Sequence, residues 1–335
     1  MTQVIVTPVS APLLDVTDLT VTLPTAHGRL AALRGVSFSL DRGATLGLVG
    51  ESGCGKSMTA LALMGLLPEG AQVSGRIVLD GTELTALDDD AMAALRGDRL
   101  AMVFQEPMTA LNPVHRIGAQ IAEPLRVHKQ LDAAAARAEA LRLLERVHLP
   151  QARERLDAYP HQLSGGQRQR VVIAIALACG PDLLIADEPT TALDATVQRE
   201  VLDLLDELKR DSGMALLLIS HNLEVMAARV ERLAVMYGGR IVESGPTKGV
   251  FDAPAHPYTR GLFAARPRLG LKRGTRLATI RGRVPGLHEM PQGCAFAERC
   301  DAARDACRAA PPPVQAVSAV HAVRCIRWNE AAAPW

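Results

Sequence analysis

The sequence has few aromatic residues, almost no net charge and no long apolar run. Its 335 residues include 37 Lys and Arg against 36 Asp and Glu, so the formal net charge is +1. A chain this close to neutral lacks the basic field that attracts nucleic acids, and we expect no nucleic-acid partner. The longest apolar candidate, residues 171–186, is broken by Gly180 and Pro181 and is shorter than a membrane span. With no secretory leader pattern in view, we expect a cytoplasmic protein.

What the sequence does contain is globular material and a phosphate-binding loop. Hydrophobic residues make up 48% of the chain, enough for roughly two domains with buried cores. In such a loop, backbone N–H groups surround a β-phosphate, a Lys contacts the β- and γ-oxygens, and a Ser hydroxyl binds Mg²⁺. A glycine-rich turn without a ligand is the alternative, but an apolar run precedes this loop and a helical pattern follows it. The loop and the first following residue are Gly50, Glu51, Ser52, Gly53, Cys54, Gly55, Lys56, Ser57 and Met58.

Four short apolar runs each end in a polar group. They cover residues 46–49, 100–104, 183–186 and 216–220, and they lead into the phosphate loop, Gln105, Asp187-Glu188 and His221 respectively. Near-continuous apolar runs of this length indicate strands buried on both faces, and helical patterns lie between them. The sequence therefore predicts an α/β fold with a mainly parallel sheet, whose ligands bind at the carboxyl ends of the strands.

Each polar residue at these strand ends has a different expected role in phosphoryl transfer. Asp187 is expected to hold Mg²⁺ through water, and Glu188 to orient or deprotonate the attacking water. His221 can contact the γ-phosphate, while Gln105 can contact both metal and water and move with the segment that it opens. A solvated acidic strand end is the alternative for the two carboxylates. For His221 alone, a structural hydrogen bond is the alternative.

A second anion site is predicted at Ser164, Gly165, Gly166 and Gln167, which precede an amphipathic helical stretch. Ser164 is a natural N-cap, and a helix N-terminus with small residues favours a phosphate. One nucleotide cannot easily use both loops of one chain. We therefore expect two chains head to tail, each nucleotide lying between the phosphate loop of one chain and the Ser-Gly-Gly helix of the other.

The order of these motifs, residues 50–57, Gln105, 163–167, 183–188, 191–194 and His221, resembles the ATP-binding-cassette (ABC) ATPases. Residues 104–113, 159–163, 235–240 and 256–260 narrow the resemblance to ATPase subunits of oligopeptide, dipeptide and nickel importers. The resemblance implies an ATPase with an N-terminal antiparallel β subdomain and a helical signature subdomain at about 106–165, within a nucleotide domain of residues 1–255. It also implies that Asp194 belongs to the nucleotide site.

The same resemblance implies a larger machine at the cytoplasmic face of the membrane. Its partners would be a second, related ATPase in a heterodimer, two membrane-spanning permeases and an external solute-binding protein. The cargo would be a peptide, with nickel or another small solute as the alternative. Helices at residues 117–128 and 132–148 would face the permeases, with residues 105–113 as the coupling segment. Soluble ABC ATPases that act on DNA or ribosomes form another class, but they carry two cassettes or a long coiled-coil insertion, which this sequence lacks.

One position departs from the family pattern. An aromatic side chain usually stacks on the adenine there, and the aligned residue is Leu23. Aromatic contacts add about 0.5–1.5 kcal/mol beyond area burial, so we expect ATP binding that is micromolar or weaker and is improved by Leu23→Tyr. Aromatic residues make up only 3% of the chain, and no nearby one substitutes.

Four of the six cysteines lie in a C-terminal extension, residues 256–335. They are Cys294, Cys300, Cys307 and Cys325, separated by five, six and seventeen residues. Disulfides are disfavoured in a reducing compartment, whereas four thiolates suit zinc or a [4Fe–4S] cluster. Zinc could also take three thiolates with His321, and unligated thiols are a third possibility. The stretch 293–300, with residues 284–285 and 321–325, resembles the extension of peptide importers, and this resemblance implies a [4Fe–4S] cluster.

Overall fold

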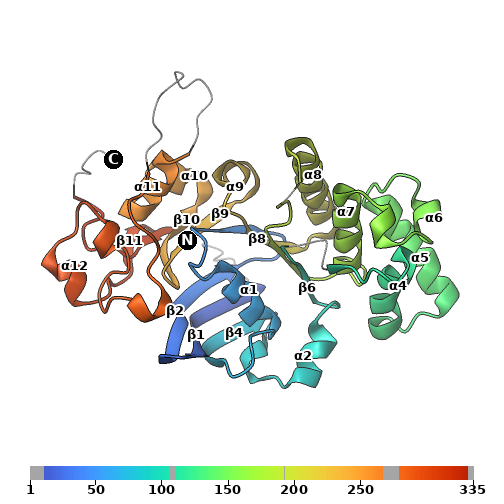
Figure 1. The fold of residues 1–335 in the computed structure, drawn as a ribbon, viewed down its shortest axis with the longest axis horizontal. Helices are drawn as coiled ribbons and strands as arrows, with labels where there is room; N and C mark the ends of the chain where they lie inside the picture. The colour runs from blue at the N-terminus through green and yellow to red at the C-terminus, as the bar shows by residue number, and fades with distance from the viewer. Residues whose placement is uncertain (1–10, 106–109, 192, 267–278, 331–335) are drawn as a thin grey trace, which may run out of the picture.

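The computed structural model describes residues 11–105, 110–191, 193–266 and 279–330 and contains two sheets. The smaller sheet is antiparallel, with strand order β2-β1-β4-β5. Its strands are β1 (Leu14–Thr25), β2 (Gly28–Leu40), β4 (Gln72–Leu79) and β5 (Thr82–Glu83). This sheet lies below the main sheet in Figure 1 and is drawn in blue and cyan. It corresponds to the antiparallel β subdomain that the resemblance implies.

The main sheet has the order β11-β12-β10-β9-β3-β8-β7-β6. The five strands from β9 to β6 are parallel, whereas β10, β12 and β11 continue the sheet antiparallel. The strands are β3 (Thr45–Val49), β6 (Leu100–Val103), β7 (Leu183–Asp187), β8 (Ala215–Ile219), β9 (Arg232–Tyr237), β10 (Arg240–Pro246), β11 (Gln315–Ser318) and β12 (His321–Val323). The predicted α/β class is confirmed, and the main sheet is mixed, with a parallel core of five strands and three antiparallel strands at one edge.

Between their terminal residues the parallel strands are apolar, because they are covered on both faces. On β7, Leu183 and Ile185 pack into a core shared with the antiparallel sheet, while Leu184 and Ala186 pack into a second core with the helices. This alternation follows from the two-residue period of a strand. All five residues of β3, β7 and β8 are buried. Polar groups therefore emerge only where these strands end.

Helices pack into both cores of the main sheet, and some of them extend into a separate group on the right of Figure 1. They are α1 (Lys56–Met64), α2 (Asp89–Leu95), α4 (Ile117–His128), α5 (Ala133–Arg146), α6 (Ala152–Arg155), α7 (Gly165–Ala176), α8 (Ala195–Ser212), α9 (Leu223–Arg229), α10 (Thr247–Asp252), α11 (Pro257–Ala264) and α12 (Asp305–Ala309). The expected helices at 117–128 and 132–148 correspond to α4 and α5. In the described ranges, no helix has the length and apolar character needed to cross a membrane. Residues 106–109 of the expected coupling segment lie outside these ranges.

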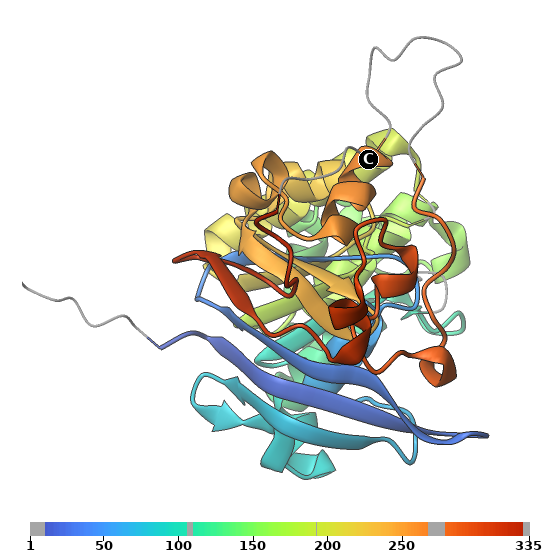
Figure 2. The ribbon, with the colours of Figure 1, turned by 90° about the vertical axis from the view of Figure 1, so that its left-hand side faces the viewer.

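The C-terminal residues are attached to the edge of the main sheet rather than standing apart. Strand β12 pairs with β10, and Figure 2 shows the red and orange segments lying along that edge, above the antiparallel sheet. Glu243 of β10, 1% exposed, accepts hydrogen bonds from the backbone N–H groups of Ala255 (2.7 Å) and His256 (2.8 Å). Its Oε1 also lies 2.8 Å from Nε2 of His321 on β12. A buried carboxylate with several partners holds these segments together, which the sequence did not indicate.

Candidate nucleotide site

A cavity of about 670 Å³ opens at the carboxyl ends of the central strands. This size suits a small-molecule ligand. Its lining residues are Leu23, Ala32, Ser52, Gly53, Gly55, Lys56, Ser57, Met58, Gln105, Glu188, His221 and Leu287. The structure thus brings together side chains from the phosphate loop and from the ends of β6, β7 and β8, as the sequence predicted.

The phosphate loop is shaped by its glycines and ends in an uncapped helix. A Cβ on Gly50 would lie 2.3 Å from the carbonyl oxygen of Met236, so only glycine fits there. Helix α1 begins at Lys56 with no side-chain cap, which leaves its first N–H groups free for an anion. The Lys56 ammonium, 7% exposed, donates to the carbonyl oxygens of Gly50 (2.8 Å) and Glu51 (3.1 Å). A bound phosphate offers this ammonium a stronger, charged acceptor.

Cys54 of the loop is fully buried, and burial raises the pKa of its thiol. A thiol in this state is a poor nucleophile. Cys54 does not line the cavity, so it acts as an apolar filler under the loop.

Asp187 has the features of a metal-site carboxylate. It is 3% exposed, and its Oδ1 has no hydrogen-bond partner in the described part of the chain. Burial raises the pKa of Asp187, and hydrogen bonding from Ser57 and the charge of Lys56 offset only part of this effect. A buried carboxylate oxygen with a free lone pair, beside a Ser hydroxyl, suits Mg²⁺, which prefers oxygen ligands. The donor set of Ser57 and Asp187 therefore fits this ion, and Gln105 lines the same cavity as Ser57, whereas Asp187 is not part of its lining.

Glu188 lies at the centre of a hydrogen-bond network. Its Oε2 accepts from Nε2 of Gln105 (3.2 Å) and from the hydroxyl of Thr191 (2.9 Å), and its Oε1 lies 3.2 Å from Nδ1 of His221. Burial opposes ionisation of this carboxyl, but the hydrogen bonds from His221 and Thr191 outweigh it and hold the pKa of Glu188 below its ordinary value. The carboxylate is thus kept ionised and oriented, as a general base requires.

The backbone of Glu188 is also unusual. Its φ of 47° lies in the left-handed region, which costs a non-glycine residue roughly 1–2 kcal/mol. The N–H of Glu188 donates to the carbonyl oxygen of Ile219 at the end of β8 (2.9 Å), which holds the residue in this conformation. Strain of this kind is characteristic of functional sites.

Several expected nucleotide contacts are not part of the lining of this cavity; they are Gly50, Glu51, Cys54, Ser164, Gly165, Gly166, Gln167 and Asp194. Two of these residues cap helices. Ser164 caps α7: its hydroxyl accepts from the N–H of Gln167 (3.3 Å), whose side chain accepts from the N–H of Ser164 (3.1 Å). Asp194 caps α8 by accepting from the N–H groups of Thr196 and Val197, both at 3.0 Å. Neither residue is part of the cavity lining, and both are exposed. Their nucleotide contacts stay predictions.

Sequence reasoning missed a contact between the phosphate loop and the C-terminal residues. One guanidinium nitrogen of Arg299 donates to both carboxylate oxygens of Glu51 (3.0 and 3.2 Å) and to the hydroxyl of Tyr237 (3.2 Å). Arg299 also lies over the rings of Tyr237 and Phe296, and the hydroxyl of Tyr258 accepts from the N–H of Glu51 (2.8 Å). The loop is therefore held from outside the motif that defines it. No local pattern in the sequence marks this contact.

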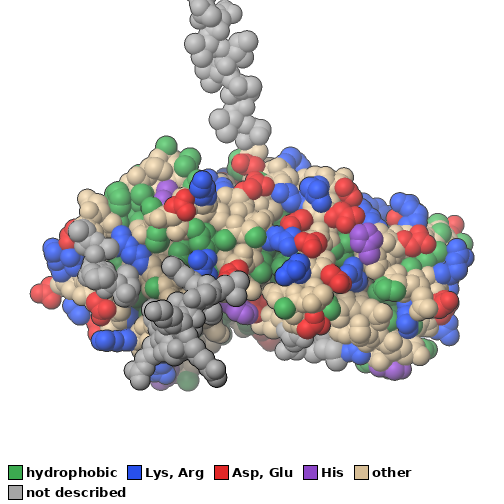
Figure 3. Space-filling view, turned by 90° about the horizontal axis from the view of Figure 1, so that it is seen from above, with side chains coloured by type: hydrophobic (Ala, Val, Ile, Leu, Met, Phe, Trp, Pro, Cys, Tyr) green, Lys and Arg blue, Asp and Glu red, His purple; other side chains and the backbone are tan. Residues whose placement is uncertain are grey.

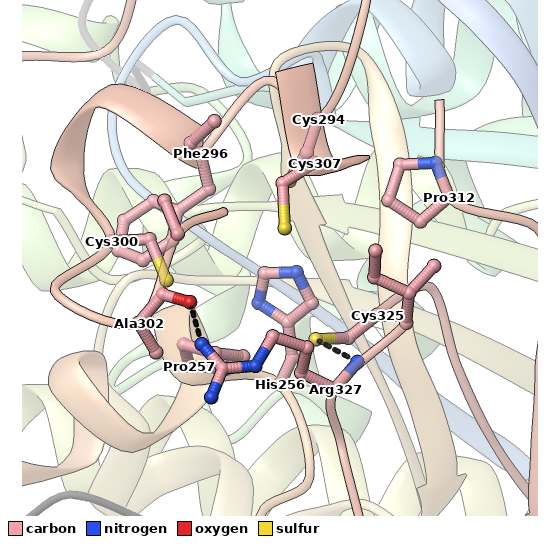
Figure 4. Close-up of a pocket in the computed structure, with 13 residues that line it drawn as sticks. His256, Pro257, Cys294, Phe296, Cys300, Ala302, Cys307, Pro312, Cys325 and Arg327 are labelled. Atoms are coloured by element: carbon pink, nitrogen blue, oxygen red, sulfur yellow. Dashed lines mark hydrogen bonds between the residues drawn. The ribbon is translucent and has the colours of Figure 1, made fainter. Parts of the chain in front are cut away.

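The four C-terminal cysteines line one cavity, together with His256 and Phe296. Figure 4 shows the side chains of Cys300, Cys307 and Cys325 directed into the same space. Burial raises the pKa of Cys294 to about 11 and also raises those of Cys300 and Cys325, so a cation is needed to keep them as thiolates.

A backbone amide supports one of these sulfurs. The N–H group of Arg327, two residues after Cys325, donates to the sulfur of Cys325 (3.4 Å). Hydrogen bonds of this type tune metal-bound thiolates. In the described ranges, no three His, Cys, Asp or Glu side chains converge closely enough to hold a single metal ion. His321 does not line this cavity and instead bonds Glu243, so the zinc alternative that used His321 does not match the structure.

The geometry agrees with comparisons to known proteins. The sequence profile described as ABC transporter matches residues 33–191, and that of the oligopeptide/dipeptide transporter C-terminal region matches residues 242–307. A candidate peptide import ATP-binding protein from Brucella melitensis is 51% identical over 334 residues, covering 96% of this chain and 99% of the relative. The oligopeptide transport ATP-binding protein OppD of Escherichia coli is 48% identical over 300 residues, covering 90% of this chain and 89% of OppD.

Solved structures show the same cassette. A dimeric ATP-binding cassette in a post-hydrolysis state, bound to ADP and Pi, aligns with a TM-score of 0.63 at 28% identity, covering 70% of this chain and 98% of that one. The cbiO1 protein of Clostridium perfringens, part of the ABC transporter complex cbiONQ, aligns with a TM-score of 0.61 at 27% identity, covering 72% and 91%. The phosphate loop, the ionised Glu188 and these relatives together identify the family. The chain belongs to the ATP-hydrolysing subunits of ABC transporters, in the group that carries the oligopeptide/dipeptide transporter C-terminal region.

Proposed function

We propose that this chain hydrolyses ATP to power the import of peptides through partner permeases. The observation that carries the proposal is the gathering of Lys56, Ser57, Gln105, Glu188 and His221 around one cavity. Peptide as cargo is supported by two relatives about half identical to this chain, which are named for peptide import and oligopeptide transport.

The chemistry follows from the hydrogen-bond network around Glu188. In the proposed reaction, Glu188 accepts a proton from the water that attacks the γ-phosphate, with Gln105 and Thr191 holding the carboxylate in place. Lys56 contacts the β- and γ-oxygens, and His221 steadies the γ-phosphate. When bound by Ser57, Asp187 and Gln105, Mg²⁺ neutralises charge on the phosphate oxygens.

The exposed start of α7 supports a paired arrangement. Ser164, Gly165 and Gly166 begin α7 away from the cavity, so a second chain is needed for them to meet a nucleotide. The solved cassette bound to ADP and Pi is itself dimeric. We propose a head-to-tail pair with a related ATPase, in which Gln167 and Asp194 lie at the interface. Loss of the bridging γ-phosphate on hydrolysis would reopen the pair.

A groove on the helical subdomain supports permease partners. This groove has a volume of about 910 Å³ and is lined mainly by α4 and by the start of α5. Val127 in this groove is 66% exposed, and the neighbouring Val114 is 74% exposed. Exposed apolar side chains beside a groove suit a docked helix.

On the face in Figure 3, acidic and basic side chains are interspersed, with no broad basic area for a nucleic acid. We therefore place the chain at the cytoplasmic face of the membrane, with an external solute-binding protein completing the importer.

We also propose that Cys294, Cys300, Cys307 and Cys325 hold a [4Fe–4S] cluster. Each of the four cysteines would supply one thiolate ligand to an iron of the cluster. The observation that supports this assignment is that all four cysteines line one cavity. The cluster would supply a structural cross-link to a segment that has few large apolar residues. The proposed extension, residues 256–335, would thus be held together by the cluster and by β12.

The test is ATP-driven uptake of labelled peptide into vesicles that contain this chain, its permeases and the binding protein. We expect uptake that requires ATP, and Glu188→Gln should bind ATP but abolish both hydrolysis and uptake. The matched control is Glu224→Gln, which removes an exposed carboxylate on α9. Uptake of nickel in place of peptide would overturn the cargo assignment. Turnover stimulated by DNA or ribosomes rather than by permeases would overturn the transport role.

A further inference from the structure

We propose that Leu287, from the C-terminal extension, forms a wall of the nucleotide cavity and packs against the base of the bound nucleotide. This inference rests on the nucleotide site of the proposed function and adds a specificity-determining residue to it. The lining of the cavity runs from Leu23 and Ala32 to the phosphate loop and the catalytic side chains, and Leu287 is part of that lining. It lies 230 positions beyond Ser57 in the sequence (287 − 57).

The lining of the cavity has an apolar part and a polar part. This division determines the orientation of the nucleotide, with its base at the apolar part and its phosphates at the polar part. Lys56, Ser57, Gln105, Glu188 and His221 take the triphosphate and its metal, as the network around Glu188 requires. The apolar side chains of the β1–β2 hairpin are left for the base. Among the described residues that line this side, Leu23 takes the place of the expected stacking aromatic ring. Part of the apolar surface of the base is therefore available for contact with a second apolar side chain.

Leu287 is placed on the hairpin side of the cavity by its neighbours. It opens the short helix η3 (Leu287–Glu289), which contacts β2. The next residue, His288, stacks on His27 in the β1–β2 turn, with ring centroids 5.1 Å apart and an interplanar angle of 24°. Since Leu23 is on the same hairpin, the two leucines belong to the same side of the cavity.

Helix η3 is also fixed from its own side. The N–H of Gly286 donates to Oε2 of Glu289 (2.9 Å), and Arg283 donates to Oε1 of the same residue (2.7 Å). These contacts hold the turn on which Leu287 sits. Because these bonds come from the extension itself, the wall is held independently of the nucleotide and binding costs little ordering at this position.

The experiment compares two probes on the purified full-length chain, MgATP and magnesium tripolyphosphate, by isothermal titration calorimetry. Tripolyphosphate has the phosphates but neither base nor ribose. We expect Leu287→Ala to weaken MgATP binding about five- to tenfold and to leave tripolyphosphate binding unchanged, since only the contact with the base is lost. Leu287→Met, which keeps most of the apolar volume, should restore most of the affinity. The matched control is Val314→Ala, which truncates a 56% exposed side chain in the same extension.

Unchanged MgATP binding in Leu287→Ala would overturn the inference, as would an equal loss for both probes, because that pattern reports a general distortion of the site. If Leu287→Ala does not fold, Leu287→Phe decides the question: it should alter the ratio of MgATP to tripolyphosphate affinity, and an unaltered ratio refutes the contact. If the wild type binds both probes and the Leu287 substitutions change neither affinity, only this inference is refuted. If the wild type binds neither probe, the proposed function itself is refuted.

Discussion

The ion pair between Arg299 and Glu51 links the C-terminal residues to the phosphate loop, and breaking it should weaken ATP binding. We consider Arg299→Met, which keeps the apolar stem but removes the charge. Removing one partner of a fully buried pair costs about 3–5 kcal/mol, whereas an exposed pair contributes about 0–1 kcal/mol. The side chain of Arg299 is 6% exposed and that of Glu51 is 29% exposed. The local cost should therefore be intermediate, about 2 kcal/mol.

Only part of this cost should appear in ATP affinity, because other bonds still hold the loop. In the variant, the hydroxyl of Tyr258 still accepts a hydrogen bond from the N–H of Glu51. The ammonium of Lys56 still donates to two carbonyl oxygens of the loop. A loop that is competent for a smaller fraction of the time binds with proportionally lower affinity. We expect the KM for ATP to rise about three- to tenfold with kcat nearly unchanged, since Arg299 does not touch the network around Glu188.

A double-mutant cycle with Glu51→Gln measures the pair itself. Without the carboxylate, Arg299→Met no longer leaves a charge unpaired, so we expect a coupling energy of about 1 kcal/mol in ATP binding. The control is Arg308→Met, which breaks the exposed pair with Glu298 in the same extension and should leave the KM unchanged. A wild-type KM in Arg299→Met, or a coupling energy near zero, would refute the idea that this pair positions the loop.

Three further predictions concern the base and the cysteines. Leu23→Tyr should tighten ATP binding a few-fold through stacking, and a titration that shows no tightening would contradict the alignment of Leu23 with the stacking position. Cys300→Ser should lower the iron content and brown colour of anaerobically purified protein while Cys179→Ser leaves both intact; stoichiometric zinc in the wild type would contradict the cluster. Gly293→Ala should lower iron content and protease resistance, because its Cβ would lie 2.4 Å from the carbonyl oxygen of Cys307. Gly249→Ala meets nothing within 4 Å and should behave as the wild type, and equal results for both would refute the steric argument.

Much of the nucleotide site could be predicted because its parts are local in sequence. The loop at residues 50–57 and the apolar run before Asp187 are contiguous patterns, and parallel strands bring their carboxyl ends to one edge. Gln105 and His221 followed from the same rule, and the structure places both within reach of Glu188. The left-handed backbone of Glu188 could not be predicted, because it depends on the carbonyl of Ile219 from another strand.

The C-terminal residues were predicted less well. The sequence identified four cysteines as a group but not the side of the molecule on which they lie. Arg299 was not recognised as a residue of functional interest, although it precedes Cys300 directly. It reaches Glu51 across 248 positions of sequence, and no spacing rule covers such a distance.

By itself, the sequence determined the α/β class, the phosphate loop and the strand-end carboxylates, because apolar periodicity and glycine spacing act between neighbouring residues. Only the tertiary structure decided that the C-terminal extension takes part in the nucleotide site, through Leu287 at the cavity and Arg299 at the loop. That arrangement depends on β12 adding to the edge strand β10 and on the buried carboxylate of Glu243 binding His321. Contacts of this kind arise from packing between distant segments, which no local pattern encodes.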